Sequence, residues 1–494
     1  MTNNVRIFKV EPDVVRSEQQ PCTSHDISVP RNISQLEEST IFERDIIRNP
    51  RLWVIKKKAY ITAFVLLTAF TATLGTPIYV GAIPIVRLKF NTTATLSVLP
   101  SSLYAFALGL GALLTSSFSE IYGRRIIYQL TLPGALLLTA LASISTKFFY
   151  LVLFKTLAGI FSAPSLTVGV GVLNDMWDPT EDRDGIIVAV LFILTIIWAT
   201  QIGPIASISL IETWGNWQWA FHISSLLLVF CVVAIFFLPE TYAPQIQRQH
   251  AREYGGVVEY RHISWHMIGQ MISRPLNMLF VEPVLFPTGF VLALTQSVIF
   301  SYYVAYAYLF QSVYGFSQVQ VGMTFAPLVL GSLLAVPVVV LCDKYLYQKA
   351  LRQARLQERA IAPEERLYPA MMSSFTMPIS LFWFAWTGKS DIPWIIPVFS
   401  GCLFGFSYLL NMICLPVYTN DIYNTQYGAS VLAGSTFLRF FVSPGFLLIM
   451  PNLLIKFGLA WSVSILGFVS IVLLPVPWVL YRYGPLLRAK GKYM

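Results

Sequence analysis

Charged residues are scarce in this chain, and the acidic ones avoid the centres of its long apolar stretches. Only 12% of the 494 residues are charged, whereas 55% are hydrophobic, and the mean hydropathy is +0.63. A single soluble core cannot bury so much apolar surface, so lipid must solvate much of it. The composition excludes a soluble globular protein and predicts an all-α protein that crosses the membrane many times.

Cysteine and histidine are also few, and neither shows the spacing of a metal-binding or catalytic site. The five cysteines lie mostly in or beside hydrophobic stretches, where a thiol packs as a small apolar group. The five histidines are spread over the amino-terminal segment, one apolar stretch and the polar centre of the chain. We therefore expect no disulfide framework, metal site or cofactor. A polytopic membrane enzyme remains only as an alternative of another class.

A hydrophobic run is missing near the start, so no secretory signal is predicted. Residues 1–58 are polar, contain several prolines, and mix acidic with basic side chains. Such a composition predicts a disordered cytosolic tail. The first apolar stretch begins at residue 59, directly after three lysines, and is expected to serve as its own insertion signal.

Apolar stretches of about 18 or more residues, the length of a membrane-spanning helix, recur through the rest of the chain. They lie at approximately 59–83, 95–117, 126–146, 150–173, 186–211, 217–238, 283–309, 319–341, 368–388, 393–417, 428–450 and 459–481. The first six fill residues 59–238 and the last six fill 283–481, with a cytosolic loop at 239–282 between them and a tail at 482–494. We expect twelve transmembrane helices in two six-helix halves, which suggests a duplication.

Lysine and arginine are concentrated in alternate loops, which predicts an orientation. Most of the 34 basic residues fall on the same side as the amino terminus, so both termini are expected in the cytosol. Two sites test this orientation, because Asn32-Ile33-Ser34 and Asn91-Thr92-Thr93 match the glycosylation acceptor pattern. Only Asn91 is expected outside, and it is the glycosylation candidate.

The short polar gap between the second and third spans holds Glu120-Ile121-Tyr122-Gly123-Arg124-Arg125. Glycine permits a turn with positive φ, and paired arginines beside a carboxylate can pin neighbouring helix ends. Asp343-Lys344-Tyr345, after the eighth span, is a weak echo of this loop. Gly203-Pro204 and Pro444-Gly445 fall at matched depths in the fifth and eleventh spans. Such interruptions are either tolerated kinks or mark the moving helices of a transporter.

Several of these motifs resemble those of the major facilitator superfamily. The loop from Ser116 to Arg125 resembles its signature between spans two and three, and Gly203-Pro204 resembles the start of its antiporter signature. Asn174-Asp175-Met176-Trp177 and the segment from Leu238 to Pro244 are similar to the fungal twelve-span drug:proton antiporters, a family that includes polyamine and multidrug exporters. The resemblance runs from roughly residue 53 to the carboxyl terminus and implies the major facilitator fold.

Charges near the predicted cytosolic ends of the spans form the first candidate site. Either they are ordinary loop residues of the positive-inside pattern, or they form ion pairs between helices that exist only while the cytosolic side is closed. The resemblance implies the second role. The candidates are Glu120, Gly123, Arg124, Arg125, Asp175, Arg183 and Glu240.

Two basic residues lie inside the spans, where an unpaired ion is expensive and suggests a functional site. Lys155 lies about one turn from the outer face, so the simplest interpretation is that its side chain snorkels to water. The resemblance places it where the family usually has an arginine. Arg439 is near the middle of the eleventh span, and we expect it to face the cavity or to pair with another helix.

Uncharged polar residues in the seventh and tenth spans are the candidates for a substrate cavity. Tyr302 and Tyr306 share one helical face, with Gln296 in the same span, and they either line a pocket or belong to an aromatic belt. Asn411 in the tenth span either points inward or bonds a neighbouring helix.

No aspartate or glutamate lies in the middle of a predicted span. A polyamine would require buried carboxylates to replace its water, so amphipathic or aromatic organic compounds rank above polyamines as substrates. The same shortage leaves the proton carrier unassigned. Asp175 and Glu282 are its candidates because they could titrate when desolvated.

These features predict a secondary active transporter that works by alternating access. The resemblance implies an efflux pump of the plasma membrane that exports drugs, toxins or fungal secondary metabolites in exchange for protons. We expect a monomer whose partners are lipid and a small-molecule substrate, with no nucleic acid involved. A polyamine exporter, an importer of the same fold and a transporter-like sensor are the alternatives.

Overall fold

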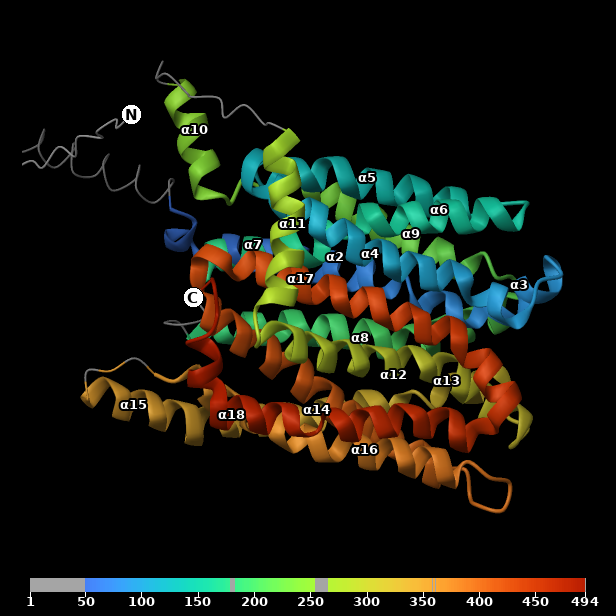
Figure 1. The fold of residues 1–494 in the computed structure, drawn as a ribbon. Coiled ribbons are helices and arrows are strands. Elements are labelled where there is room, and N and C mark those ends of the chain that lie inside the picture. The colour runs from blue at the N-terminus through green and yellow to red at the C-terminus, as the bar shows by residue number, and fades with distance from the viewer. Residues whose placement is uncertain (1–48, 178–182, 254–264, 358, 360, 494) are drawn as a thin grey trace, which may run out of the picture. The chain divides into compact units, whose positions relative to one another are not determined.

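The computed structural model describes residues 49–177, 183–253, 265–357, 359 and 361–493. Within these residues every regular element is a helix, as the apolar pattern predicted (Figure 1). Most of the predicted amino-terminal tail, including Asn32, lies outside the described residues. The backbone of Arg183 begins a helix, but its side chain is not described.

The first half contains the crossings between residues 55 and 235. Its elements are η1 (Pro50–Leu52), α2 (Ile55–Leu74), η2 (Pro77–Ala82), α3 (Ile83–Lys89), α4 (Ala94–Tyr122), α5 (Arg124–Ser143), α6 (Phe148–Ser162), α7 (Pro164–Met176), α8 (Arg183–Trp214) and α9 (Trp219–Ile235). Thr93 caps α4 by accepting a hydrogen bond from the Leu96 N–H at 3.2 Å. Pro164 begins α7, and its missing N–H costs no hydrogen bond there because the first N–H groups of a helix have no partner within it. The helices α6 and α7 together fill one predicted span.

The second half begins after two helices that occupy the predicted central loop, α10 (Ala243–Glu253) and α11 (Trp265–Val281). Its elements are α12 (Leu285–Ser312), α13 (Gln318–Met323), α14 (Ala326–Cys342), η3 (Asp343–Tyr347), α15 (Gln348–Leu356), η4 (Pro363–Arg366), α16 (Tyr368–Thr387), α17 (Ile395–Leu473) and α18 (Pro475–Arg488). A capping box at Ser317 and Gln320 starts α13. The last helix runs to Arg488, so most of the predicted carboxyl-terminal tail is helical.

Nine helical runs among the described residues are long and apolar enough to cross a membrane. One of them, Ser430–Arg488, has 59 residues, about twice what a single crossing needs. Gly458, with a φ of 69°, marks the point where this run turns back. With α9 and α16, which match predicted spans, the crossings number twelve as expected. Large apolar side chains such as Leu130, Phe237 and Val472 are exposed on the outside, where lipid solvates them.

The crossings alternate in direction, so their ends fall into two groups. We call one group the basic end; it contains the turn at Gly123, the end of α7, η3 and Arg488. We call the other group the opposite end; it contains Asn91 and the turns at Gly215 and Gly315. Figure 1 shows α10, α15 and the carboxyl-terminal end of the chain at the basic end, with α3 at the opposite end.

Candidate functional site

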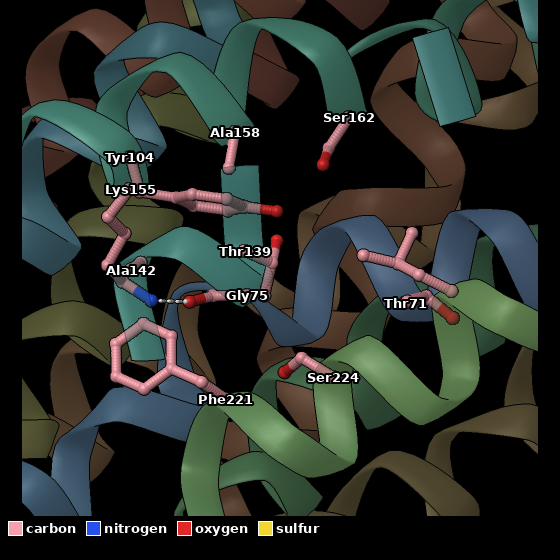
Figure 2. Close-up of a pocket in the computed structure, with 11 residues that line it drawn as sticks. Thr71, Gly75, Tyr104, Thr139, Ala142, Lys155, Ala158, Ser162, Phe221 and Ser224 are labelled. Carbon is pink, nitrogen blue, oxygen red and sulfur yellow. Dashed lines mark hydrogen bonds between the residues drawn. The ribbon is translucent and has the colours of Figure 1, made fainter. Parts of the chain in front are cut away.

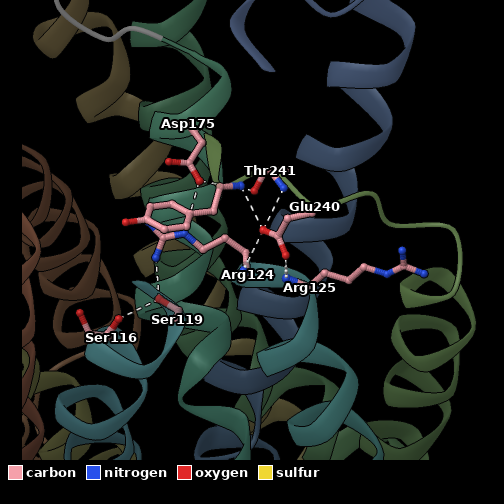
Figure 3. A network of polar contacts seen from close by, with 8 residues as sticks. Ser116, Ser119, Arg124, Arg125, Asp175, Glu240 and Thr241 are labelled. Atoms are coloured by element: carbon pink, nitrogen blue, oxygen red, sulfur yellow. Dashed lines mark hydrogen bonds and ion pairs between the residues drawn. The ribbon is translucent and has the colours of Figure 1, made fainter. Parts of the chain in front are cut away.

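A network of charged side chains lies at the basic end, between the turn that joins α4 to α5 and the segment that follows α9 (Figure 3). Nε of Arg124 donates to Oδ2 of Asp175 at 3.3 Å, and its Nη1 donates to Oγ of Ser119 at 2.5 Å. The hydroxyl of Thr241 also donates to Asp175, at 3.4 Å. The side chains of Arg124 and Asp175 are only 10% and 19% exposed, so water screens this ion pair less than a surface pair.

Glu240 completes the network by accepting backbone hydrogen bonds. Its Oε1 accepts from the N–H groups of Arg124 at 2.9 Å and Tyr242 at 3.0 Å, and its Oε2 accepts from that of Arg125 at 3.1 Å. The first N–H groups of a helix have no partner within it, so a carboxylate here satisfies the start of α5 and interacts favourably with its dipole. Gly123 allows the Glu240 carboxylate to lie this close to the start of α5, because a Cβ at this position would lie 2.5 Å from Oε2 of Glu240. Its φ of 96° is also one that residues with a side chain rarely adopt.

The remaining charges predicted for this site stand apart from the network. Glu120 is exposed at the end of α4. Arg125 contributes its backbone N–H, while its side chain points away from Asp175 (Figure 3). The side chain of Arg183 lies outside the described part of the chain. All the described members of the network belong to the first half, so the ion pair joins helices within one half and does not bridge the two halves.

Arg366 forms an equivalent pair in the second half, which the sequence analysis did not predict. Its Nε donates to Oδ2 of Asp421 at 2.7 Å, and its Nη1 lies 3.8 Å from Oδ1 of Asp343. The guanidinium lies 3.8 Å from the centre of the Tyr347 ring. Burial alone would lower the pKa of Arg366, but the Asp421 and Asp343 carboxylates and Tyr347 raise its pKa above the usual value.

The sequence carries a signal that could have found this second pair. Arg124 begins the third crossing of its half and its partner lies 51 residues further on. Arg366 immediately precedes the third crossing of the other half and its partner lies 55 residues further on. Asp343, the predicted echo of the loop at Glu120, takes part through Arg366. A search for matched arginine-to-aspartate spacings in the two halves would have identified both pairs.

Glu282, one of the two predicted proton sites, anchors the end of the described chain. Its carboxylate is 1% exposed and accepts a hydrogen bond from the Tyr423 hydroxyl at 2.9 Å. It also accepts from the backbone N–H groups of Lys492 at 2.7 Å and Tyr493 at 2.9 Å. These donors satisfy a buried carboxylate that would otherwise be costly. The side chain joins the start of α12 to the tenth crossing and to the segment after α18.

Lys155 points into the first half, so the prediction that it snorkels to the membrane surface is wrong. The residue is 4% exposed, and Nζ donates to the Gly75 carbonyl at 2.9 Å. That carbonyl is available because α2 ends one residue earlier, and the last carbonyls of a helix lack helical partners. The rings of Tyr79, Tyr104 and Phe221 lie with their centres 5.2, 5.2 and 4.7 Å from Nζ, which favours the cation.

A cavity of about 20 Å³ lies beside Lys155 (Figure 2). Its lining includes the hydroxyl-bearing side chains of Thr71, Thr139, Ser162 and Ser224. This volume has room for a single water molecule, and polar walls of this kind can hold one. The lining contains no carboxylate, so Lys155 meets only neutral groups here.

Arg439 is the second basic residue inside the spans, and it too has neutral neighbours. Its Nη1 donates to Sδ of Met412 at 3.4 Å, and the guanidinium lies 4.8 Å from the centre of the Phe440 ring. Its Nε is buried and has no hydrogen-bond partner in the described part of the chain, where no ion pair of Arg439 occurs either. A guanidinium has five N–H donors, so most of the hydrogen-bonding capacity of Arg439 is unused in the described part of the chain.

Polar side chains from both halves meet where α8 contacts α12 and α14. The central cluster, as we call it, comprises Thr200, Gln201, Gln296, Tyr303, Ser332 and Tyr408. The Tyr303 hydroxyl donates to the Thr200 carbonyl at 2.8 Å, and the Ser332 hydroxyl donates to Oε1 of Gln201 at 3.1 Å. Tyr408 donates to Oε1 of Gln296 at 2.9 Å. Of these residues the sequence analysis selected only Gln296, although Thr200 and Gln201 stand out as a polar pair within an apolar span.

The other residues predicted for a substrate cavity lie in the packed interior of the second half. Tyr302 and Tyr306 are 0% exposed, their rings stack at 4.9 Å, and each lies 5.0 Å from Phe384. Asn411 donates to Oγ1 of Thr295 at 3.2 Å. Asn411 thus bonds a neighbouring helix, one of the two alternatives for its position, and it also lines an interior cavity of about 20 Å³.

The two predicted glycine-proline interruptions have unlike surroundings. A Cβ on Gly203 would lie 2.5 Å from Cγ of Pro77, whereas a Cβ on Gly445 would meet nothing within 4 Å. Near Gly203, the Ser207 hydroxyl accepts from the Gly81 N–H at 3.0 Å. A Cβ on Gly81 would lie 2.8 Å from that hydroxyl oxygen. The close approach of α8 to η2 therefore depends on glycines from both sides, and the sequence analysis did not select Gly81.

Asn91, the glycosylation candidate, is exposed in the turn between α3 and α4 and has a φ of 48°. Asparagine adopts this left-handed region more readily than most residues. Thr93, the third residue of its acceptor pattern, caps α4.

Known proteins similar to this chain are transporters. The chain is 28% identical over 476 residues to polyamine transporter 4 of Saccharomyces cerevisiae, covering 90% of this chain and 71% of that protein. It is 29% identical over 446 residues to the efflux pump FUB11 of Gibberella moniliformis, covering 87% and 74%. The structure is similar to that of the proton:xylose symporter XylE, with a TM-score of 0.64 at 12% identity over 87% of this chain and 96% of that one.

The match to a family model is broader than any motif. The model of the Major Facilitator Superfamily matches residues 65–444, from within the first span to within the eleventh. Together with the twelve crossings and the fold shared with solved transporters, this match shows that the chain is a membrane transporter rather than an enzyme, and that it belongs to the Major Facilitator Superfamily.

Proposed function

We propose that this transporter exports small amphipathic organic compounds from the cytosol across the plasma membrane in exchange for protons. The observation that carries the proposal is the central cluster, which places polar side chains from both halves at a buried contact. Apolar side chains would pack there at lower cost, since each polar group left unpaired in such a place costs about 1 to 3 kcal/mol. An alternating-access carrier binds its substrate between its two halves, and polar side chains at that place can bind the polar groups of the substrate.

The distribution of contacts between the halves supports alternating access. Hydrogen bonds join the halves at the central cluster and at the opposite end, where Oε2 of Glu212 accepts from the Val319 N–H at 2.9 Å. Thr95 and Asn452 pair at 3.3 Å near the same end. At the basic end the described ion pairs remain within one half, as for Arg124 with Asp175. Such a pattern is expected of a carrier that is closed at the opposite end. We propose that the basic end faces the cytosol.

Export of polyamines is the second candidate, because one relative is a polyamine transporter. The acidic side chains argue against it. Among the described residues, the buried ones lie at the basic end, as Glu240, Glu282 and Glu364 do. A polycation that crosses the middle of the protein would find no carboxylate there to replace its water.

Proton exchange needs a group that gains and loses a proton during the cycle. Of the two predicted candidates, Asp175 fits better, because its side chain is 19% exposed and its ion pair with Arg124 could break and reform. Glu282 is held by three donors that tie down a chain segment. We therefore propose that Asp175 carries the proton. We also propose that the protein is a monomer and that Asn91 is glycosylated.

The test is an efflux assay in cells with and without the gene. A panel of fluorescent aromatic compounds and spermidine is loaded, and their retention is measured with and without a proton uncoupler. We expect faster loss of at least one aromatic compound in cells with the gene and abolition of that difference by the uncoupler. Unchanged retention of every compound contradicts export, and a difference for spermidine alone contradicts the substrate ranking.

A further inference from the structure

Three buried polar atoms in and beside the central cluster are hydrogen-bond donors without a partner among the described residues. They are Nε2 of Gln201, Nε2 of Gln296 and Nε of Arg439. Gln201 is 0% exposed and Gln296 is 2% exposed, so the described protein shields both amides from bulk solvent. Buried donors are almost always paired in proteins, and exceptions call for an explanation such as a ligand.

The acceptor atoms of the same two glutamines are already engaged. Oε1 of Gln201 accepts from Ser332, and Oε1 of Gln296 accepts from Tyr408. What the site offers to a ligand is therefore a set of N–H groups. A ligand rich in acceptor atoms would satisfy them, whereas an ammonium group would add donors to a place that already has too many.

Electrostatics favour the same kind of ligand. Arg439 contacts Met412, which lies one helical turn from Tyr408, the partner of Gln296. It carries a positive charge with no carboxylate partner among the described residues. Lys155 adds a second unpaired positive charge within the first half. A bound anion would stabilise a cation that is otherwise expensive inside the membrane.

We infer that the transported compound presents an anionic oxygen group, most simply a carboxylate, which Arg439 binds with the help of the Gln201 and Gln296 amides. A guanidinium and a carboxylate form paired, charge-assisted hydrogen bonds that are stronger than neutral ones. Aromatic rings accompany these groups, since Tyr303 and Tyr408 belong to the central cluster and the Phe440 ring lies 4.8 Å from the guanidinium, and they suit an aromatic body attached to that group. The inference rests on the proposed function and names the substrate class of that site.

Binding to the purified full-length protein tests this inference without transport. The probes are naphthalene-2-carboxylate, naphthalene-2-carboxamide and naphthalene-2-methylammonium, which share one aromatic body and differ in charge. Thermal unfolding in detergent is followed against probe concentration. We expect the carboxylate to stabilise the wild-type protein at concentrations at least about tenfold lower than either counterpart, the factor that one charge-assisted contact supplies.

Variants then place the effect at Arg439. Arg439→Gln should abolish the preference for the carboxylate, and Arg439→Lys should retain part of it because the charge remains. Lys456→Gln is the matched control, since it removes one positive charge from an exposed position on the same helix. Gln201→Leu provides a test that leaves the charge untouched and should weaken carboxylate binding.

Each outcome decides the inference. A wild-type protein that responds equally to all three probes, responds best to the ammonium, or responds to none overturns it, and so does an unchanged preference in Arg439→Gln. Efflux of the same probes from cells separates it from the proposed function. A protein that binds the carboxylate but exports nothing contradicts export alone, whereas export of the ammonium without the carboxylate contradicts the substrate class alone.

Discussion

Arg124 lies 3.3 Å from Asp175, and the same relationship recurs in the second half between Arg366 and Asp421 at 2.7 Å. In both halves the arginine stands at the start of the third crossing and the aspartate near the end of the fourth. Matched pairs of this kind are expected if the two halves arose by duplication, which the loop sequences suggest only weakly. Each pair fastens helices within its own half at the basic end.

A double-mutant cycle on the first pair should show strong coupling. We expect Arg124→Gln and Asp175→Asn each to lower the free energy of unfolding by about 2 kcal/mol, since each leaves a partly buried charge without its partner. The double variant should lose clearly less than the sum. The measurement is thermal unfolding of the purified protein, with Arg366→Gln, Asp421→Asn and their combination as the parallel cycle. Additive losses would show that the two charges do not interact.

Gly123→Ala should impair the protein through two effects that a control can separate. An alanine at a φ of 96° is strained by about 1 kcal/mol or more, and its Cβ would also lie 2.5 Å from Oε2 of Glu240. Gly215→Ala is the control, because that glycine has a φ of 68° but no heavy atom within 4 Å of the added Cβ. We expect the first substitution to lower the thermal unfolding temperature more than the second. Equal losses would mean that the contact with Glu240 is unimportant.

The two glycine-proline interruptions should respond differently to alanine. Gly203→Ala would push a Cβ to 2.5 Å from Pro77 and separate α8 from η2, so transport should fall. Gly445→Ala meets nothing within 4 Å and removes a flexible residue from α17, so it should be neutral or slightly stabilising. Transport rates corrected for the amount of protein in the membrane provide the comparison. A loss in both variants would favour matched hinges over tight packing at one of them.

The sequence predicted the crossings far better than the side-chain contacts. Spans such as 95–117 and 368–388 follow from apolar runs, and α4 and α16 match them closely, because lipid requires each run to be helical. The direction in which a side chain points does not follow from the apolar runs. Lys155 was placed at the membrane surface by its depth alone, yet the carbonyl left free where α2 ends draws it inward. The break in α2 has a local signal, because Gly75 and Pro77 interrupt the first span, but that signal does not say which side chain pairs with the freed carbonyl.

The central cluster was missed for a related reason. Tyr302 and Tyr306 attracted attention because aromatic residues at helical spacing resemble a pocket lining, but the same spacing also fits a packed interior. Tyr303, one residue away, faces the first half and reaches Thr200. Deciding between adjacent faces of a helix requires knowing which neighbour lies on each side, and a single sequence does not contain that information.

Glu282→Ala should release the segment after α18 without unfolding the helices. Oε1 of the carboxylate accepts from the backbone N–H groups of Lys492 and Tyr493, and alanine removes this shared acceptor. We expect faster hydrogen exchange in a peptide that covers residues 489–493. Tyr423→Phe removes one donor to the carboxylate but leaves both backbone bonds, so exchange there should change little. Unchanged exchange in Glu282→Ala would mean that other contacts hold the segment.

Lys155→Met should separate a functional charge from a structural one. Methionine fills nearly the same volume and removes an ammonium that donates to the Gly75 carbonyl and lies among three aromatic rings. Replacing a buried charge by an apolar group of similar size is often neutral for stability, so the thermal unfolding temperature should stay within a few degrees of wild type. Transport should nevertheless fall at least about tenfold, because a charge retained inside the membrane at such cost usually serves function. Lys155→Ala is the control for lost volume and should lower the unfolding temperature by leaving a cavity. If methionine destabilises the protein as much as alanine does, the ammonium itself holds α2 and α6 together and the residue is structural.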